Sequence, residues 1–168
     1  SKFQITLLLS KEGARICKKQ NVENLNTIVW SSDTFASISY FIDYSYRTCI
    51  CLYKSCFIPL TPGDLVFSTS DFWPDSLSAL LMKLREPKIK WVAGFFLFAP
   101  KPWGKDTPYT GKSRVKGVGF WLTQQLSYYL INQFADKILV ESEPDVAPFV
   151  TDKRPSDQVL VIRGGVDL

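Results

Sequence analysis

The chain has 168 residues, of which 46% are hydrophobic and 21% charged, and its formal net charge is +4. This length supports one domain that buries a core of its own. The sequence contains no histidine, which excludes the commonest general base and the commonest metal ligand.

The N-terminal third predicts two strands and a helix. Residues 3–9 (FQITLLL) and 26–30 (NTIVW) are short apolar runs with the length of strands. Residues 35–57 have helical spacing instead. The apolar residues that recur on one side of this segment are Ile38, Phe41, Ile42 and Tyr46.

The four cysteines bear on the cellular compartment. They are Cys17, Cys49, Cys51 and Cys56, and the last three have the spacing C-x-C-x₄-C, which matches no zinc-binding pattern. We expect buried, reduced thiols and no metal site, and hence a cytosolic protein. The start of the chain also lacks the pattern of a secretory signal peptide.

The middle of the chain predicts a strand and a well-delimited helix. A turn at 61–64 (TPGD) precedes the strand 64–70 (DLVFSTS), and the helix covers 70–87. The residues that delimit the helix are Ser70 or Asp71 as its cap, Pro74 in its first turn and Pro87 at its end. Its apolar stripe comprises Leu77, Leu80, Leu81 and Leu84.

A strand at 88–98 leads into a basic loop, residues 99–116. Between Lys83 and Lys116 the sequence has nine Lys or Arg against two acidic residues, a local excess of seven positive charges. Such an excess favours an anionic partner, such as a phosphate group, a nucleic acid or an acidic membrane surface. Nucleic acid is the less favoured of these, because no nucleic-acid-binding motif accompanies the charge.

The longest uncharged run is 117–135, and it contains too many polar residues to span a membrane. We expect an amphipathic helix here, with an apolar face that consists of Leu122, Leu126, Tyr129, Leu130 and Phe134. A strand at 136–142 follows. The capping box of Ser142 and Asp145 then predicts the start of another helix, and residues 157–162 form the last predicted strand.

Strands and helices alternate along the chain, and the strands are continuous apolar runs. This combination is typical of a parallel sheet covered by helices. The predicted fold is α/β, a Rossmann-like, mostly parallel sheet with helices on both faces, formed by residues 1–168 as a single domain. Six strand residues should then be buried: Leu7, Val29, Val66, Val92, Leu139 and Val161. Ligands of such sheets bind at the carboxyl ends of the strands.

Three segments resemble the acceptor-side domain of GT-B glycosyltransferases, in particular the large retaining family four. Residues 135–142 resemble that family's strand of the form "ad.vi..S". Residues 161–167 resemble its strand end "NGVD", with Gly164 in place of the usual asparagine. Residues 64–81 (DLVFSTSDFWPDSLSALL) are similar to its middle strand and following helix. The resemblance covers most of the chain from about residue 64 onward.

This resemblance implies half of a two-domain enzyme. The chain would be the acceptor-binding N-terminal domain of a retaining glycosyltransferase, which moves a sugar from a nucleotide-sugar donor to a glycan or a lipid-linked acceptor. The interdomain hinge would begin at about 163–168, the C-terminal donor domain would be absent, and the isolated chain would be inactive. No metal or other cofactor is implied. Residues 3–9 would correspond to the family's second strand or to the first strand of a shortened version.

One departure from the family concerns catalysis. Many members carry a histidine just after the strand that matches residues 90–96, whereas this sequence continues with FLFAPKPW. The resemblance therefore assigns no catalytic residue.

Nine residues are candidates for binding because they follow predicted strands. The acceptor-binding candidates are Asp71, Trp73, Lys101, Trp103 and Glu141, and the hinge or donor-proximal candidates are Arg163, Gly164, Gly165 and Asp167. Asp71 could instead cap the helix that follows it, and the two glycines could serve only a turn.

The basic loop also predicts a location. Its aromatic and cationic side chains suit a sugar, a phosphate or a membrane interface, and a solvated loop is the alternative interpretation. We expect a cytoplasmic protein that is peripheral at the inner face of the cell membrane. The alternative function is a non-catalytic α/β module that docks a partner chain carrying the chemistry.

Overall fold

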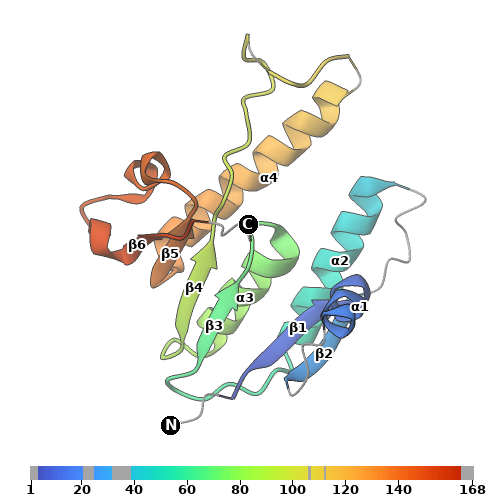
Figure 1. Ribbon diagram of the computed structural model, residues 1–168, viewed down its shortest axis with the longest axis vertical. Helices are drawn as coiled ribbons and strands as arrows, with labels where there is room; N and C mark the ends of the chain where they lie inside the picture. The colour runs from blue at the N-terminus through green and yellow to red at the C-terminus, as the bar shows by residue number, and fades with distance from the viewer. Residues whose placement is uncertain (1–3, 21–24, 32–38, 106, 112, 164–168) are drawn as a thin grey trace. The chain divides into compact units, whose positions relative to one another are not determined.

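The computed structural model describes residues 1–168 except 1–3, 21–24, 32–38, 106, 112 and 164–168 (Figure 1). It divides into two compact units, Ser1–Phe57 and Ile58–Leu168, which are described separately below. Both units consist of parallel strands and helices, so the predicted α/β class with parallel sheets flanked by helices is confirmed.

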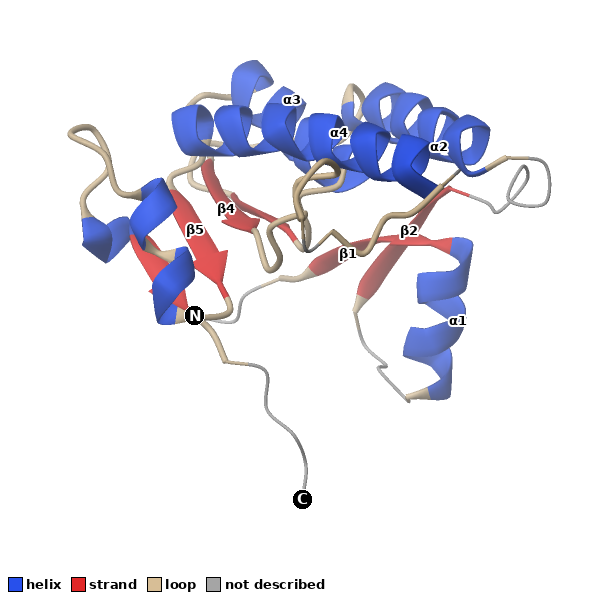
Figure 2. Cartoon of the chain, turned by 90° about the horizontal axis from the view of Figure 1, so that it is seen from above, coloured by secondary structure: helices blue, strands red, loops and turns tan. Residues whose placement is uncertain are grey.

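The first unit contains a two-stranded parallel sheet. Its elements are β1 (Thr6–Ser10), α1 (Lys11–Lys19), β2 (Asn26–Ser31) and α2 (Tyr40–Ser55). Figure 2 shows α1 and α2 on opposite sides of this strand pair. The helix α1 was not predicted from the sequence. It begins at Ser10, whose hydroxyl accepts a hydrogen bond of 3.0 Å from the backbone N–H of Gly13.

Two expectations about burial in this unit are wrong. Val29 is exposed, because a strand side chain points out of the sheet and pairing with β1 in the plane of the sheet does not cover it. Of the four thiols, all of which are free, only that of Cys51 is buried; Cys49 and Cys56 are exposed and Cys17 is half-buried. Cys49 and Cys51 of α2 and Cys56 at its C-terminal cap follow each other at spacings of two and five residues, so they cannot all share the buried side of the helix.

The second unit contains a four-stranded sheet in which every neighbouring pair is parallel. The elements are β3 (Leu65–Ser68), α3 (Trp73–Arg85), β4 (Lys90–Gly94), α4 (Ser113–Phe134), β5 (Lys137–Val140) and β6 (Val159–Val161). The strand order is β3-β4-β5-β6, so the chain moves across the sheet in one direction. Right-handed crossovers in one direction place successive helices on the same face. Accordingly, α3 and α4 lie side by side on one face (Figure 2).

The core of this unit lies between that face and the two helices. Its largest fully buried side chains include Trp91 and Phe95 from the β4 region, Ile131 of α4 and Phe149. The indole N–H of Trp91 donates a 3.0 Å hydrogen bond to the hydroxyl of Ser68 on the adjacent strand. This polar group of the core is thus paired across neighbouring strands, whereas the buried hydroxyl of Ser78 on α3 has no hydrogen-bond partner among the described residues.

The opposite face of the sheet has exposed apolar residues along its two edge strands, β3 and β6. Its exposed residues are Leu65, Phe67 and Leu160, with Ile162 just past β6.

Of the strand residues predicted to be buried, Leu139 is buried, whereas Leu7, Val66, Val92 and Val161 are only half-buried.

The helix α4 has an unexpected orientation. A surface helix normally turns its apolar side toward the core. Here the predicted apolar face is largely exposed, since Leu122, Leu126, Tyr129 and Phe134 all face solvent. The buried residues of α4 are Gly117, Gln124, Ser127 and Ile131.

The helix predicted to begin at Ser142 is absent. The structure has two short 3₁₀ turns there, Glu143–Asp145 and Ala147–Phe149. The hydroxyl of Ser142 donates a hydrogen bond of 2.5 Å to the carboxylate of Asp145. This bond joins two side chains, and no α-helix begins there. Pro148 explains the difference, because proline lacks a backbone N–H and disfavours helical backbone in the residue before it.

Asp136 joins three elements at the amino ends of the strands. Its carboxylate accepts hydrogen bonds from Lys83 (2.9 Å), from Lys90 (3.2 Å) and from the backbone N–H of Trp91 (2.8 Å). Partial burial alone would raise the pKa of Asp136, but these bonds outweigh it and lower the pKa below its usual value. The ionised carboxylate is therefore the form that stabilises this end of the sheet.

We expect Asp136→Asn to lower the free energy of unfolding by about 1.5–3 kcal/mol at neutral pH, because hydrogen bonds to a charged group are lost. A lowered pKa contributes stability above the unfolded-state pKa and loses it as pH falls through the folded-state value. The difference from wild type should therefore shrink below about pH 4. Chemical denaturation at both pH values measures it, with the exposed Asp152→Asn as the control. An equal deficit at every pH would contradict the assignment.

Candidate functional site

The carboxyl ends of β3, β4 and β5 lie at one edge of the four-stranded sheet. Three stretches follow these ends: residues 69–72 after β3, the long segment 95–112 after β4, and residues 141–145 after β5. In parallel sheets this edge is where ligands bind. Most of the candidates named from the sequence come from these stretches.

Gln124 of α4 holds two of these stretches together. Its side-chain N–H₂ donates to the carboxylate of Asp71 (2.9 Å) and to the carbonyl of Leu97 (2.7 Å). Its side-chain oxygen accepts from the backbone N–H of Ala99 at 2.5 Å. Gln124 is only 3% exposed, so these bonds satisfy an amide that has little access to water.

Asp71 is a buried carboxylate at the end of β3. It is not the N-cap residue of α3: Phe72 lies at that position, and the side chain of Phe72 makes no capping hydrogen bond. The interpretation of Asp71 as a helix cap is therefore wrong. Burial raises the pKa of Asp71, and the nearby charge of Asp75 raises it further, although the bond from Gln124 acts in the opposite direction.

Asp75 supplies a second carboxylate close by. It lies in the first turn of α3 and accepts hydrogen bonds from the hydroxyls of Thr69 (2.9 Å) and Ser70 (2.7 Å). A negative side chain there complements the positive helix N-terminus. Two carboxylates therefore lie near the end of β3. Asp75 accepts hydrogen bonds from two hydroxyl groups, and Asp71 is buried and accepts one from the side-chain amide of Gln124.

The two candidate tryptophans have different environments. The indole N–H of Trp73 donates a 3.0 Å hydrogen bond to the backbone carbonyl of Thr123, so this half-buried ring is fixed against α4. Trp103 is 61% exposed, and its ring packs edge-on against Trp121 with centroids 4.9 Å apart. Lys101 lies in the same loop and is exposed. Trp103 and Lys101 are thus available to a ligand, whereas the ring of Trp73 is held against α4 by its hydrogen bond to Thr123.

The remaining candidates are not drawn into this network. Glu141 is exposed immediately after β5, and Arg163 is exposed two residues beyond the end of β6. The candidates Gly164, Gly165 and Asp167 lie outside the described residues. The structure therefore connects Asp71 and Trp73 through adjacent residues of α4, and leaves Glu141 and Arg163 separate from them.

Within the described part of the chain, no group of three or more acidic, cysteine or histidine side chains is arranged to hold a metal ion. None of the helices described has the length and hydropathy needed to cross a bilayer.

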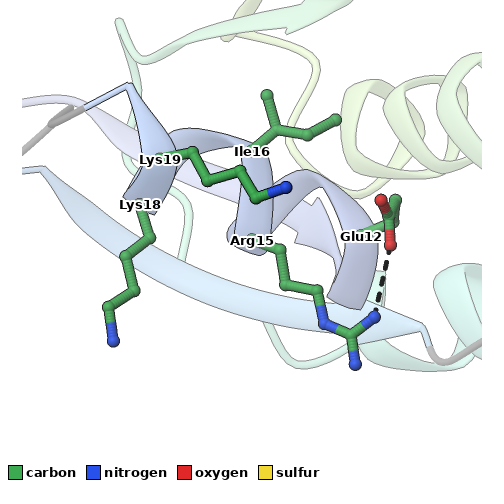
Figure 3. A pocket seen from close by; sticks show the side chains of 5 residues that line it. All are labelled: Glu12, Arg15, Ile16, Lys18 and Lys19. Atoms are coloured by element: carbon green, nitrogen blue, oxygen red, sulfur yellow. Dashed lines mark hydrogen bonds and ion pairs between the residues drawn. The ribbon is translucent and has the colours of Figure 1, made fainter.

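A surface hollow of about 410 Å³ lies in the first unit, along α1 (Figure 3). Its walls come from this one helix: Glu12, Arg15, Ile16, Lys18 and Lys19. The side chains point in different directions instead of converging, and Arg15 is paired with Glu12 at 3.4 Å. This hollow does not present convergent groups to a ligand, and it contains none of the candidates named from the sequence.

Comparison with known proteins adds no family assignment. The sequence matches no model of a known protein family, and no curated protein matches it.

Gln124 is the residue that the sequence analysis missed. In the sequence it is one of the polar residues in the run 117–135 that argue against a membrane span. The pattern that could have revealed Gln124 is its spacing from Ser127 and Ile131, which lie three and seven positions further along the helix. Residues at this spacing share one face of a helix, and here that face is buried.

We expect Asp71→Asn to stabilise the protein at neutral pH by about 1 kcal/mol, because it removes a buried charge and keeps an oxygen for Gln124. A raised folded-state pKa gives a contribution that is fully present below the unfolded-state pKa and is lost as pH rises. The gain should therefore vanish in acid. The control Asp64→Asn should have the reverse sign, since the Thr61 amide and hydroxyl lower the pKa of Asp64. Thermal unfolding across pH measures both; a loss of stability in Asp71→Asn at pH 7 would contradict the assignment.

Proposed function

We propose that this chain is the acceptor-binding N-terminal domain of a retaining glycosyltransferase. In this function a sugar moves from a nucleotide-sugar donor, held by a second domain, to a hydroxyl of a glycan or a lipid-linked acceptor. The observation that carries the proposal is the buried carboxylate of Asp71, held by Gln124 at the carboxyl end of a strand in an all-parallel sheet. The likeness of residues 64–81, 135–142 and 161–167 to that family supports it.

The chemistry of the edge suits a sugar. Sugar hydroxyls donate hydrogen bonds, and an ionised carboxylate is a strong acceptor for them. The exposed ring of Trp103 offers an apolar face for a sugar ring. The exposed ammonium group of Lys101 can pair with a phosphate of a lipid-linked acceptor.

The proposed location follows from the same loop. A lipid-linked acceptor lies at a membrane, and exposed cations around Trp103 favour an anionic surface. We therefore propose a protein that is peripheral at the inner, cytoplasmic face of the cell membrane. No nucleic acid is required as a partner, and the leaving diphosphate of the donor would be stabilised by the second domain.

Trp103→Ala should lower the affinity for an acceptor glycan about 10-fold, because the stacking ring is removed. The probe is a panel of soluble oligosaccharides and prenyl-phosphate-linked sugars, with binding followed by calorimetry. Tyr53→Ala is the matched control, since Tyr53 of the first unit is an aromatic residue of similar exposure. Binding to no member of the panel, or equal loss in both variants, would argue against the acceptor site.

The 168-residue chain alone should transfer no sugar, because the proposed donor site belongs to another domain. Radiolabelled nucleotide sugars incubated with the purified chain and an acceptor from the panel test this. Sugar transfer by the chain alone would contradict the proposal that the donor site belongs to a second domain. Tight binding to a partner protein, with no glycan bound, would instead favour the alternative of a non-catalytic docking module.

A further inference from the structure

The outward side of α4 carries an apolar stripe. Val115, Leu122, Leu126 and Tyr129 are between 43% and 69% exposed. They are separated by seven, four and three residues, which places them in one line along a helix. This line lies opposite the buried Gln124, Ser127 and Ile131, because those residues are offset from it by about half a turn.

Packing within the second unit does not explain this stripe. The side of α4 that contacts α3 carries small and polar groups, among them Ser127, whose hydroxyl lies 3.4 Å from that of Ser76. Large apolar side chains that gather on an exposed surface usually mark an interaction site. The stripe therefore has a use outside the fold of this unit.

The charges of α4 itself have one sign, and the loop before it adds three lysines against one acidic residue, Asp106. The 22 residues of α4 include no Asp or Glu, and Arg114 and Lys116 are exposed in its first turns. Positive charge is unfavourable at a helix N-terminus, so these two cations do not serve the stability of the helix. Lys101 and Lys105 of the preceding loop are exposed as well, beside the exposed ring of Trp103.

We propose that the outward face of α4, with the loop before it, docks onto an anionic lipid bilayer. In this arrangement the helix lies in the plane of the interface, the stripe enters the acyl boundary, and the cations contact lipid phosphates. Tryptophan favours the same interfacial depth. A cationic rim around an apolar stripe matches a negatively charged surface, whereas a second copy of this chain would bring the same positive charges.

The inference deepens the membrane-proximal acceptor of the proposed function and names the surface that meets the membrane. It can be tested without any glycosyl transfer. Failure to bind vesicles would contradict the proposed docking surface and would not affect the outcome of the acceptor-binding test. Failure of acceptor binding would leave the vesicle result standing.

The test is sedimentation of the chain with vesicles of phosphatidylcholine alone or of phosphatidylcholine mixed with phosphatidylglycerol. We expect binding only to the mixed vesicles, weakening steeply with added salt because the charges are screened. Lys101, Lys105, Arg114 and Lys116 changed together to Gln should reduce binding at least about 10-fold. Leu122→Gln with Leu126→Gln should reduce it by a similar factor.

The matched control is Leu160→Gln with Ile162→Gln, which changes two apolar residues of comparable exposure, 44% and 49%, at the sheet. This control should bind vesicles as the wild type does. Tryptophan emission should shift to shorter wavelength on binding in the wild type and not in the stripe variant.

Three results would overturn the proposal. The first is no binding to mixed vesicles, or binding indifferent to lipid charge. The second is equal binding by the stripe variant and the wild type. The third is a stripe variant with a lowered melting temperature or a changed oligomeric state in the absence of lipid, which would make the stripe a contact between protein surfaces.

Discussion

The side-chain amide of Gln124 sets the orientation of α4. This buried amide has three partners in hydrogen-bond reach: the carboxylate of Asp71, the carbonyl of Leu97 and the amide of Ala99. Turning α4 so that its leucines faced inward would expose Gln124 and leave these partners without it. Leaving one buried polar group unpaired costs about 1–3 kcal/mol, and three partners would lose Gln124 in the turned helix. Burying one leucine side chain contributes only about 1.5–3 kcal/mol. The helix therefore lies with its polar side inward.

The same bonds build the edge where the candidate site lies. They connect the end of β3 with the segment after β4, and Trp73 adds a bond to the backbone next to Gln124. Asp71 is thereby held as a carboxylate with a raised pKa in a fixed place. The exposed groups of the site, Trp103 and Lys101, stand on the loop that this framework supports.

The sequence predicted the elements better than it predicted their orientation. Continuous apolar runs located all six strands that the structure describes, and Pro74 and Pro87 bounded α3 to within a few residues. The helix α1 was missed because the segment KEGARICKK has no apolar stripe; its start depends on the single cap of Ser10. In α4 the periodicity revealed a stripe and could not show which side faces the core, since that depends on partners far away in sequence.

The sequence predicted some residues of the candidate site and not others. Asp71 and Trp73 were found because they follow a strand, which is a local pattern. Gln124 was missed because its partners lie as many as 53 residues away, and nothing local distinguishes it from a solvent-facing glutamine. Its role follows only from the packing of α4 on the sheet.

The central claim is that α4 has its polar side buried and its apolar side exposed. The free energies of unfolding of Gln124→Met and Leu122→Gln, measured side by side in urea, test it most directly. The account predicts a loss of at least about 2 kcal/mol for Gln124→Met, which keeps the volume and removes the hydrogen bonds. It predicts a change within about 0.5 kcal/mol for Leu122→Gln, because that side chain is exposed. The reverse order of the two losses would contradict it.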